Sequence, residues 1–140
     1  MSRVRASRYH DFSYGHRIDG HESKCRFLHG HNGRVHFVCQ GELDTLGRVL
    51  DFSVIKEKLC QWVEDNWDHK FLLWEKDHWF AKLDEAGAPG IIAVPFNPTA
   101  ENMGIHLIDV IGPTQLEGTG VTLVKVEIEE TRKCSAEVMI

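Results

Sequence analysis

The sequence lacks any long apolar run. No stretch approaches the roughly 20 apolar residues of a membrane-spanning helix, and residues 1–5 contain no apolar signal core. It also lacks an excess of positive charge, since 16 Lys and Arg stand against 21 Asp and Glu and give a net charge of −5. No basic patch is interleaved with aromatic residues, so we expect neither a nucleic acid nor a membrane as a partner. These absences predict a cytoplasmic protein.

Repeats, low-complexity tracts and linkers are absent as well, and 140 residues suffice for one domain with an ordinary core. The four cysteines are an even number, but in the cytoplasm they are not expected to form disulfides. Cys39 and Cys60 lie in apolar patterns and are predicted to be core residues. Cys25 differs because it lies between Lys24 and Arg26, and cationic neighbours favour the reactive thiolate form.

The stretch that carries chemistry is 25–33, Cys-Arg-Phe-Leu-His-Gly-His-Asn-Gly, with His16 shortly upstream. In an extended strand successive side chains point to opposite faces, so His29 and His31 project on the same side. His16 is in phase with the aromatic residues before it, so a neighbouring strand can present it to the same site. Three imidazoles without an evident fourth protein ligand are typical of a catalytic zinc site, which keeps one position open.

A plainer interpretation applies to most of the nine histidines, because an isolated histidine is usually a surface or hydrogen-bonded residue. Imidazole sites also accept several divalent metals, so the pattern does not by itself single out zinc. The histidines interpreted as ordinary residues are His10, His21, His36, His78 and His106.

Alternation and helical spacing predict the order strand, strand, helix, helix, strand. This order is typical of an α+β fold in which helices pack on one face of an antiparallel sheet. The expected strands cover residues 4–16, 29–40 and 121–130, with further short ones at 91–94 and 135–140.

The first helix is predicted to begin after Ser53 as N-cap and to end near residues 68–69, an Asp-His pair. The second begins after Thr99, with Glu101 in its first turn, and is expected to stop at the Gly-Pro pair 112–113. Residues 74–80 are compatible with a further short helix.

The last long strand places Glu130 in phase with Val124, Val126 and Ile128. A carboxylate on a buried face is costly unless it is paired or hydrogen-bonded. Two alternatives follow. Either Glu130 points inward and accepts hydrogen bonds from a cationic or amide-like ligand edge, or the strand ends at Ile128 and leaves Glu130 in solvent.

Short motifs occur along nearly the whole chain in a fixed order. They are Phe-Ser-Tyr-Gly-His ending at His16, Lys-Cys followed by Leu-His-Gly-His-Asn within 24–32, Asp-Phe at 51–52, Asp-His at 68–69, Pro-Thr-Ala-Glu-Asn at 98–102 and Glu-Thr at 130–131. This set resembles the 6-pyruvoyl-tetrahydropterin synthase superfamily. The spacing C-x3-H-G-H resembles its bacterial branch, the 6-carboxytetrahydropterin synthases of queuosine biosynthesis, whereas the pyruvoyl branch places the cysteine two residues further upstream.

The resemblance implies the tunnelling fold (T-fold), a four-stranded antiparallel sheet with two helices on one face that assembles into an oligomeric barrel. Trimers, and usually dimers of trimers, are the implied homo-oligomers. The implied zinc ligands are His16, His29 and His31. The implied catalytic residues are Cys25, its partners Asp68 and His69, and Glu130, which anchors the pterin ring, while Thr131, Thr99, Ala100 and Glu101 line the substrate pocket.

The implied substrate is 7,8-dihydroneopterin triphosphate, cleaved to the 6-carboxy product with loss of acetaldehyde and triphosphate. Arg17, Lys24 and Arg26 are candidates for the triphosphate, unless they are ordinary solvated charges. Elimination of triphosphate to a pyruvoyl product, or action on sepiapterin-like compounds, is the alternative within the superfamily. From a different class, the chain could be a zinc-stabilised binding module without turnover, with Cys25 as the fourth ligand.

Overall fold

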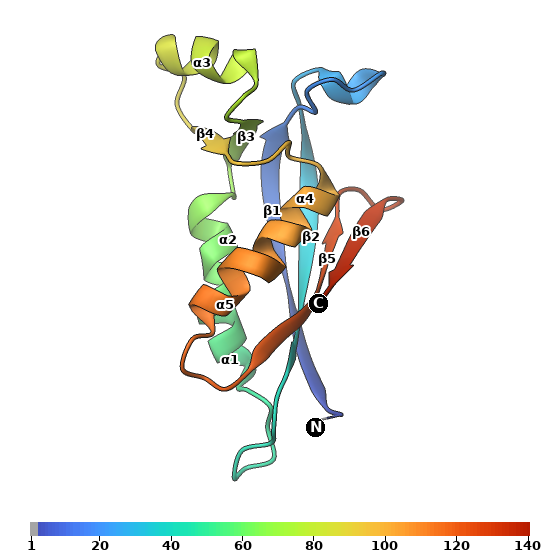
Figure 1. The fold of residues 1–140 in the computed structure, drawn as a ribbon, viewed down its shortest axis with the longest axis vertical. Helices are drawn as coiled ribbons and strands as arrows, with labels where there is room; N and C mark the ends of the chain where they lie inside the picture. Colours follow the sequence, from blue (N-terminus) through green and yellow to red (C-terminus); the bar gives the residue numbers. More distant parts are fainter. Residues whose placement is uncertain (1–2) are drawn as a thin grey trace.

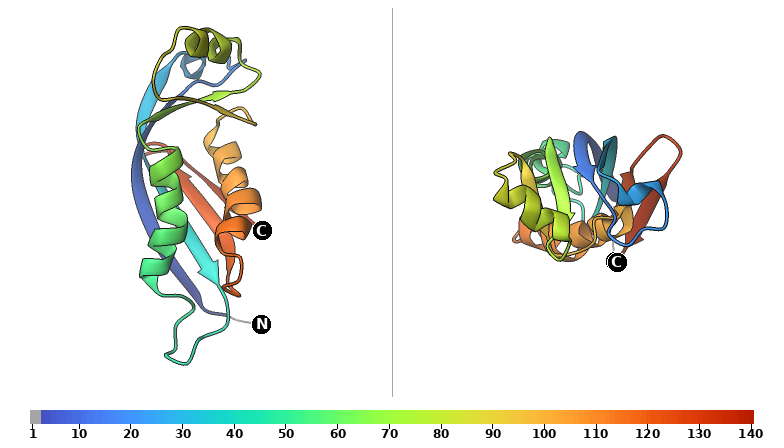
Figure 2. Two further views of the ribbon diagram at one scale, coloured as in Figure 1. Left: turned by 90° about the vertical axis from the view of Figure 1, so that its left-hand side faces the viewer. Right: turned by 90° about the horizontal axis from the view of Figure 1, so that it is seen from above.

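Two strands of twelve residues form the centre of the molecule, β1 (Arg5–His16) and β2 (His29–Gln40). They pair antiparallel over their whole length, with Arg5 opposite Gln40 and His16 opposite His29. The computed structural model describes residues 3–140. Around this pair the sheet extends on both sides and curls, and the long helices cover one of its faces (Figures 1 and 2). The predicted α+β class is confirmed.

The sheet has six strands in the order β4-β3-β1-β2-β5-β6. On one side β5 (Thr122–Glu129) pairs antiparallel with β2, and β6 (Ser135–Met139) with β5. On the other side β3 (Lys70–Trp74) runs parallel to the end of β1, and β4 (Ile91–Val94) runs parallel to β3.

The expectation of four antiparallel strands is therefore wrong in number and partly in direction. The discrepancy lies at the β3–β4 edge. Apolar runs as short as these do not reveal by periodicity whether they are strands, nor which neighbour they join. Gly15 of β1 is part of the reason that β3 fits there, because the Phe71 ring occupies the place where a Cβ atom would lie.

Two long helical segments lie on the same face of the sheet (Figure 2). Each contains a π turn, in which the hydrogen-bond register widens from i→i+4 to i→i+5. The first consists of α1 (Phe52–Ile55), η2 (Lys56–Cys60) and α2 (Gln61–Asn66), and the second of α4 (Ala100–His106), η3 (Leu107–Ile111) and α5 (Gly112–Gln115). A 3-10 turn η1 (Lys24–Arg26) and helix α3 (His78–Glu85) complete the elements.

Two predicted helix starts need correction. Asp51, not Ser53, caps the first helix, because its carboxylate accepts a hydrogen bond from the Ser53 backbone N–H. The helix expected at residues 74–80 begins instead at His78, where the Asp77 carboxylate caps it through the Trp79 N–H. Each cap is an Asp that satisfies a free N–H of the first turn.

The second long helix does not stop at the Gly-Pro pair 112–113 but continues to Gln115. Pro113 lies in the first turn of α5, directly after the π turn η3. The π turn has already interrupted the i→i+4 hydrogen bonds at this point, so the missing N–H of proline does not cost a regular helical hydrogen bond. The predicted cap at Thr99 is confirmed, since its Oγ1 accepts from the Asn102 N–H at 3.0 Å.

The core lies between the sheet and these helices. Cys39 and Cys60 are buried in it, as predicted, and burial raises the pKa of the Cys39 thiol to about 12, so this thiol is not a nucleophile. No helix in the described part of the chain is long and apolar enough to cross a membrane. The largest fully buried side chains include Trp67, Phe37, Ile55, Leu59, Leu72, Met103, Leu107 and Ile128, and the same set contains His16.

Candidate metal centre and active site

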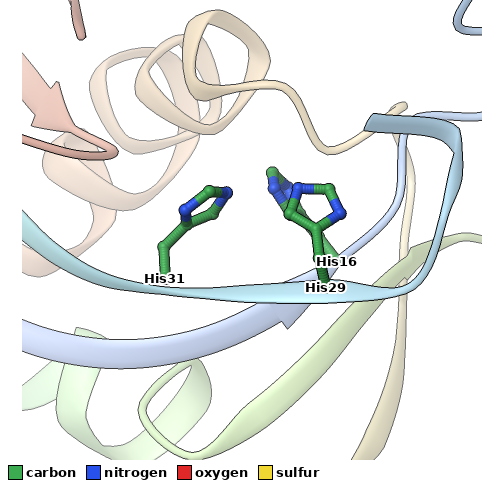
Figure 3. A group of neighbouring side chains, drawn as sticks. All are labelled: His16, His29 and His31. Atoms are coloured by element: carbon green, nitrogen blue, oxygen red, sulfur yellow. The ribbon is translucent and has the colours of Figure 1, made fainter. Parts of the chain in front are cut away.

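Three imidazoles from β1 and β2 converge on one point (Figure 3). The antiparallel register places His16 opposite His29, and Tyr14 opposite His31, so the strand alternation directs all three rings to the helix-covered face. Their ring centroids lie 4.6, 5.0 and 4.9 Å apart, and one nitrogen of each lies within 4.8 Å of the other two. The predicted histidine triad is confirmed as a spatial cluster.

Backbone carbonyls fix two of the rings. His16 Nδ1 lies 2.7 Å from the Pro98 oxygen, and His29 Nδ1 lies 2.7 Å from the Phe27 oxygen. Because a carbonyl oxygen only accepts, Nδ1 carries the proton in each ring, and Nε2 keeps a lone pair for a metal. This arrangement is the one usual for metal-binding histidines.

Two of the Nε2 atoms make no hydrogen bond in the described part of the chain. His16 Nε2 and His31 Nε2 are buried and have no hydrogen-bond partner among the described residues. Burial also lowers the pKa of His31, against the opposing effect of the Glu130 carboxylate, so the neutral metal-binding form is favoured. Buried polar atoms are seldom left unpaired, and three neutral imidazoles are a donor set that zinc accepts. The residues present therefore fit a divalent metal.

Glu130 follows the last residue of β5 and points inward. Its Oε1 lies 3.3 Å from His16 Nε2 and 3.4 Å from His31 Nε2. Of the two alternatives, the inward orientation is therefore confirmed. The contact with His16 is the main reason that the pKa of the Glu130 carboxyl is lowered; burial opposes this, and the charges of His31 and His16 add to it. The sequence showed no evident fourth ligand apart from Cys25 in the binding-module alternative, and the phase of Glu130 along the strand was the signal for its position beside the triad.

A second group of potential ligand atoms comes from Asp19, Asp77 and His78. It differs from the triad because a guanidinium already lies between its carboxylates: Arg17 donates to Asp77 at 2.9 Å and to Asp19 at 3.2 Å. The side chain of Arg17 is only 8% exposed. Arg17 is thus neither a solvated charge nor free to bind triphosphate, and it supplies the positive charge that a cation would bring.

The Asp68–His69 pair is held against β1. Asp68 Oδ1 accepts from the Ser13 N–H at 2.9 Å, and His69 N donates to the Ser13 oxygen at 2.6 Å. His69 has a φ of 58°, a left-handed conformation that is uncommon outside glycine, and its Nδ1 lies 2.6 Å from Asp68 Oδ2. Partial burial works against the charged form of Asp68, but the bonds from Ser13 and His69 outweigh it and lower the pKa of this carboxyl. A carboxylate thus orients an exposed imidazole.

This pair opens on the other face of the sheet from the triad. It lines a pocket of about 690 Å³ together with Ser13, Asn32 and Arg34, which alternate with the inward-facing histidines along β1 and β2. Asp68 and His69 were predicted to act together with Cys25. Cys25 is half-buried in η1, and no hydrogen bond within residues 3–140 joins it to either of them. Within one chain the structure does not assemble these three residues.

Cys25 is not a fourth ligand of the triad in this structure. Its sulfur is not part of the group of atoms that lie within 4.8 Å of one another at His16, His29 and His31, in a search that covered the described cysteines. The binding-module alternative, which needs this sulfur on the metal, therefore finds no support in the geometry.

The segment expected to line the substrate pocket also positions a ligand. The Thr99 hydroxyl caps α4, Ala100 is buried and Glu101 is exposed, while Pro98 holds His16. Thr131 Oγ1 accepts from the N–H groups of Lys133 and Cys134 in the turn before β6. Sequence reasoning missed this role of Pro98, because a backbone carbonyl leaves no signature in the side-chain pattern.

Comparison with known proteins agrees with this geometry. The family model described as 6-pyruvoyl tetrahydropterin synthase matches residues 5–139. A 6-carboxy-5,6,7,8-tetrahydropterin synthase of Rickettsia typhi is 35% identical over 137 residues, which cover 96% of this chain and 99% of that protein. The protein of that name from Synechocystis is 38% identical over 109 residues, covering 61% of this chain and 81% of the relative.

Solved structures show the same fold. A protein of Wolinella succinogenes superposes with a TM-score of 0.84 at 23% identity, over 97% of both chains. The 6-pyruvoyl tetrahydropterin synthase of Caenorhabditis elegans superposes with a TM-score of 0.70 at 25% identity, over 98% of this chain and 95% of that one. The match of the family model, the identity to the Rickettsia relative and the shared fold lead to one conclusion: this chain belongs to the 6-pyruvoyl tetrahydropterin synthase family.

Proposed function

We propose that the protein is a zinc-dependent 6-carboxy-5,6,7,8-tetrahydropterin synthase of the 7-deazaguanine (queuosine) pathway. It would convert 7,8-dihydroneopterin triphosphate to 6-carboxytetrahydropterin and release acetaldehyde and triphosphate. The observation that carries the proposal is the convergence of His16, His29 and His31, in which Nε2 of His16 and of His31 is buried and has no hydrogen-bond partner among the described residues. Cys25 precedes His29 by four residues, in the C-x3-H-G-H spacing. Relatives that match nearly the whole chain bear the name of this enzyme, which favours it over the pyruvoyl alternative.

His16, His29 and His31 would hold the metal. When bound, it supplies Lewis acidity, which makes protons next to a coordinated oxygen easier to remove. The chain's own residues supply the rest. Cys25 would take a proton from the substrate side chain as a thiolate, and His69, oriented by Asp68, would move protons as general acid and base.

Glu130 would accept two hydrogen bonds from the amino-pyrimidine edge of the pterin and fix its register. Thr131 and the segment with Thr99, Ala100 and Glu101 are proposed to line the same pocket. The exposed Lys24 and Arg26 remain candidates for the triphosphate.

The placement of the Asp68–His69 pair supports the proposal of a homo-oligomer. Both residues line a pocket with side chains of the sheet face opposite to the triad, and no hydrogen bond among the described residues joins them to Cys25, so we propose that they serve the metal site and Cys25 of a neighbouring protomer. A hexamer built as a dimer of trimers is the proposed assembly, with trimers or tetramers as alternatives. Each protomer would then supply the metal ligands to one site and the proton-relay pair to another.

The test is to incubate zinc-loaded protein with dihydroneopterin triphosphate and to assay acetaldehyde together with the pterin products. Acetaldehyde with 6-carboxytetrahydropterin supports the proposal. A pyruvoyl product without acetaldehyde would assign the protein to the sister activity. Absence of turnover in a sample shown to contain zinc would favour the non-enzymatic binding module.

The Cys25→Ala variant separates the enzyme from the binding module more sharply. If Cys25 acts only as a proton acceptor, the variant retains zinc at the wild-type stoichiometry and loses turnover by a factor on the order of 10² to 10⁴. Metal content by atomic absorption and turnover are measured on the same sample. Loss of zinc from this variant would contradict the proposed role, because it would place the sulfur on the metal.

A further inference from the structure

Glu130 lies closer to two of the histidines than it would need to if it only anchored the pterin ring. Its Oε1 lies 3.3 Å from His16 Nε2 and 3.4 Å from His31 Nε2, yet neither nitrogen has a hydrogen-bond partner. The oxygen is thus near both nitrogens without the alignment of a hydrogen bond. Such contacts place three potential donor atoms around a common point.

These separations match those of ligands that share one ion. With zinc–nitrogen and zinc–oxygen distances of about 2.0–2.2 Å and tetrahedral angles, two ligand atoms lie roughly 3.3–3.5 Å apart. Both contacts of Glu130 fall in this range. His29 makes no ion pair with Glu130 among the described residues, so its partly exposed ring has to move closer to complete a regular tetrahedron.

Nothing else in the surroundings accounts for this carboxylate. Its side chain is 25% exposed, and the ion pairs that it makes within residues 3–140 are with the two imidazoles and with no Lys or Arg. Neither Cys25 nor Glu130 belongs to the group of atoms that all lie within 4.8 Å of one another, but Glu130 lies within 3.4 Å of two nitrogens of that group. A partly buried carboxylate that contacts two imidazoles and no Lys or Arg is well placed to share a cation with them.

We propose that Glu130 is a displaceable fourth ligand, which binds the metal in the resting protein and leaves it when the pterin ring arrives. The inference rests on the proposed function, in which the same carboxylate binds the amino-pyrimidine edge. That edge and the side chain at C6 are opposite ends of the bicyclic ring. With the side chain at the metal, the edge lies away from it, so Glu130 cannot contact metal and ring at the same time.

The consequence is a coupling between ring recognition and access to the metal. A compound without the amino-pyrimidine edge leaves Glu130 on the metal and the site closed. A pterin withdraws the carboxylate and frees one coordination position for the oxygens of its own side chain. The contacts of Glu130 with His16 and His31 are those expected of the closed arrangement.

Cobalt(II) substitution tests the ligand directly, because its visible absorption reports the number and kind of ligands. The variant is Glu130→Gln, and the matched control is Glu127→Gln, whose carboxylate lies on the other face of β5, 3.7 Å from His36. We expect wild type and E127Q to share one spectrum and E130Q to differ from both. In competition with a chelator, E130Q should bind the metal at least about tenfold more weakly. An E130Q spectrum identical to that of wild type would overturn the proposal, even if loss of charge weakened binding.

The displacement step is tested with pterin itself, which carries no side chain to coordinate the metal. Adding pterin should shift the wild-type cobalt spectrum towards that of E130Q and leave E130Q unchanged. A wild-type spectrum that stays constant under saturating pterin, or a protein that does not bind pterin, would overturn the displacement. The proposed function fails separately: no turnover of dihydroneopterin triphosphate by wild type rejects the synthase, whatever the cobalt spectra show.

Discussion

Among single residues, His16 is the candidate ligand whose position the fold determines most completely. It is fully buried, its Nδ1 is bonded to the Pro98 oxygen, and its Nε2 has no partner. The phase of His16 along β1 was readable from the sequence. The bond to Pro98, 82 residues away, was not, because strand alternation gives the face of a side chain and not its distant contacts.

Replacing His16 with Gln should remove metal binding almost completely. The loss should exceed the 10- to 100-fold that is typical when only a supporting contact of a ligand is removed. Zinc affinity is measured by chelator competition, with His10→Gln as control, since His10 lies in the middle of β1, away from the triad, and its ring contacts Glu64. Equal affinity of the two variants would contradict the assignment of His16.

Asp68 is the residue that orients His69, so Asp68→Asn should affect proton transfer and not metal binding. The substitution keeps the shape and removes the negative charge next to Nδ1 of His69. We expect turnover to fall by a factor on the order of 10² to 10⁴ with an unchanged zinc content. The control is Asp65→Asn, an exposed residue of α2 that bonds Gln61. A variant that kept full turnover would show that the dyad has no role in the reaction.

At the scale of helices and strands, an element could be predicted when its apolar and polar residues alternated regularly over enough residues. β1 and β2 alternate over twelve residues, and the sequence analysis placed both strands and the faces of their histidines correctly. The π turns η2 and η3 were not predictable, because one extra residue per turn hardly disturbs an apolar stripe. β3 was missed, since five residues between a helix and a turn carry too little periodicity.

The N-cap of α4 offers a test at this scale. Thr99→Ala removes the acceptor of the Asn102 N–H, so the free energy of unfolding should fall by about 1 kcal/mol. Thr99→Ser retains a hydroxyl and should recover most of this loss. Both are compared in the metal-free protein by urea denaturation, which avoids effects through Pro98 and His16. Equal stability of the Ala and Ser variants would show that the cap contributes nothing.

At the scale of the whole molecule, the two long helical segments are joined through an aromatic cluster. The His106 ring of α4 lies 6.3 and 6.5 Å from the rings of Trp62 and Trp67 and 5.1 Å from that of Phe96. Burial lowers the pKa of His106, because the charged form loses hydration there. The stability of the fold is thereby linked to pH through a residue outside the candidate site.

The direction of this linkage follows from the lowered pKa. Above the ordinary value of 6.5, His106 is neutral in both the folded and the unfolded chain, and it causes no change with pH. Below 6.5 the unfolded chain takes up the proton first, so stability falls until the folded pKa is reached. Melting temperatures between pH 7 and pH 5 should therefore fall less for His106→Gln than for wild type. The control His21→Gln, on an exposed loop, should follow wild type; a parallel fall for all three would refute the linkage.

The pairing of His16 with His29 also bears on the order in which the molecule assembles. Only the twelve residues 17–28 separate them, so the β1–β2 hairpin brings the three imidazoles together through short loop closure. Pro98 and Glu130 come from 82 and 114 residues beyond His16 (98 minus 16 and 130 minus 16) and join only when the rest of the chain has docked. The hairpin therefore brings the three candidate ligands together first, and the later segments orient and enclose them. The candidate metal centre is thus expected to begin as a local event in folding and to be completed as a global one.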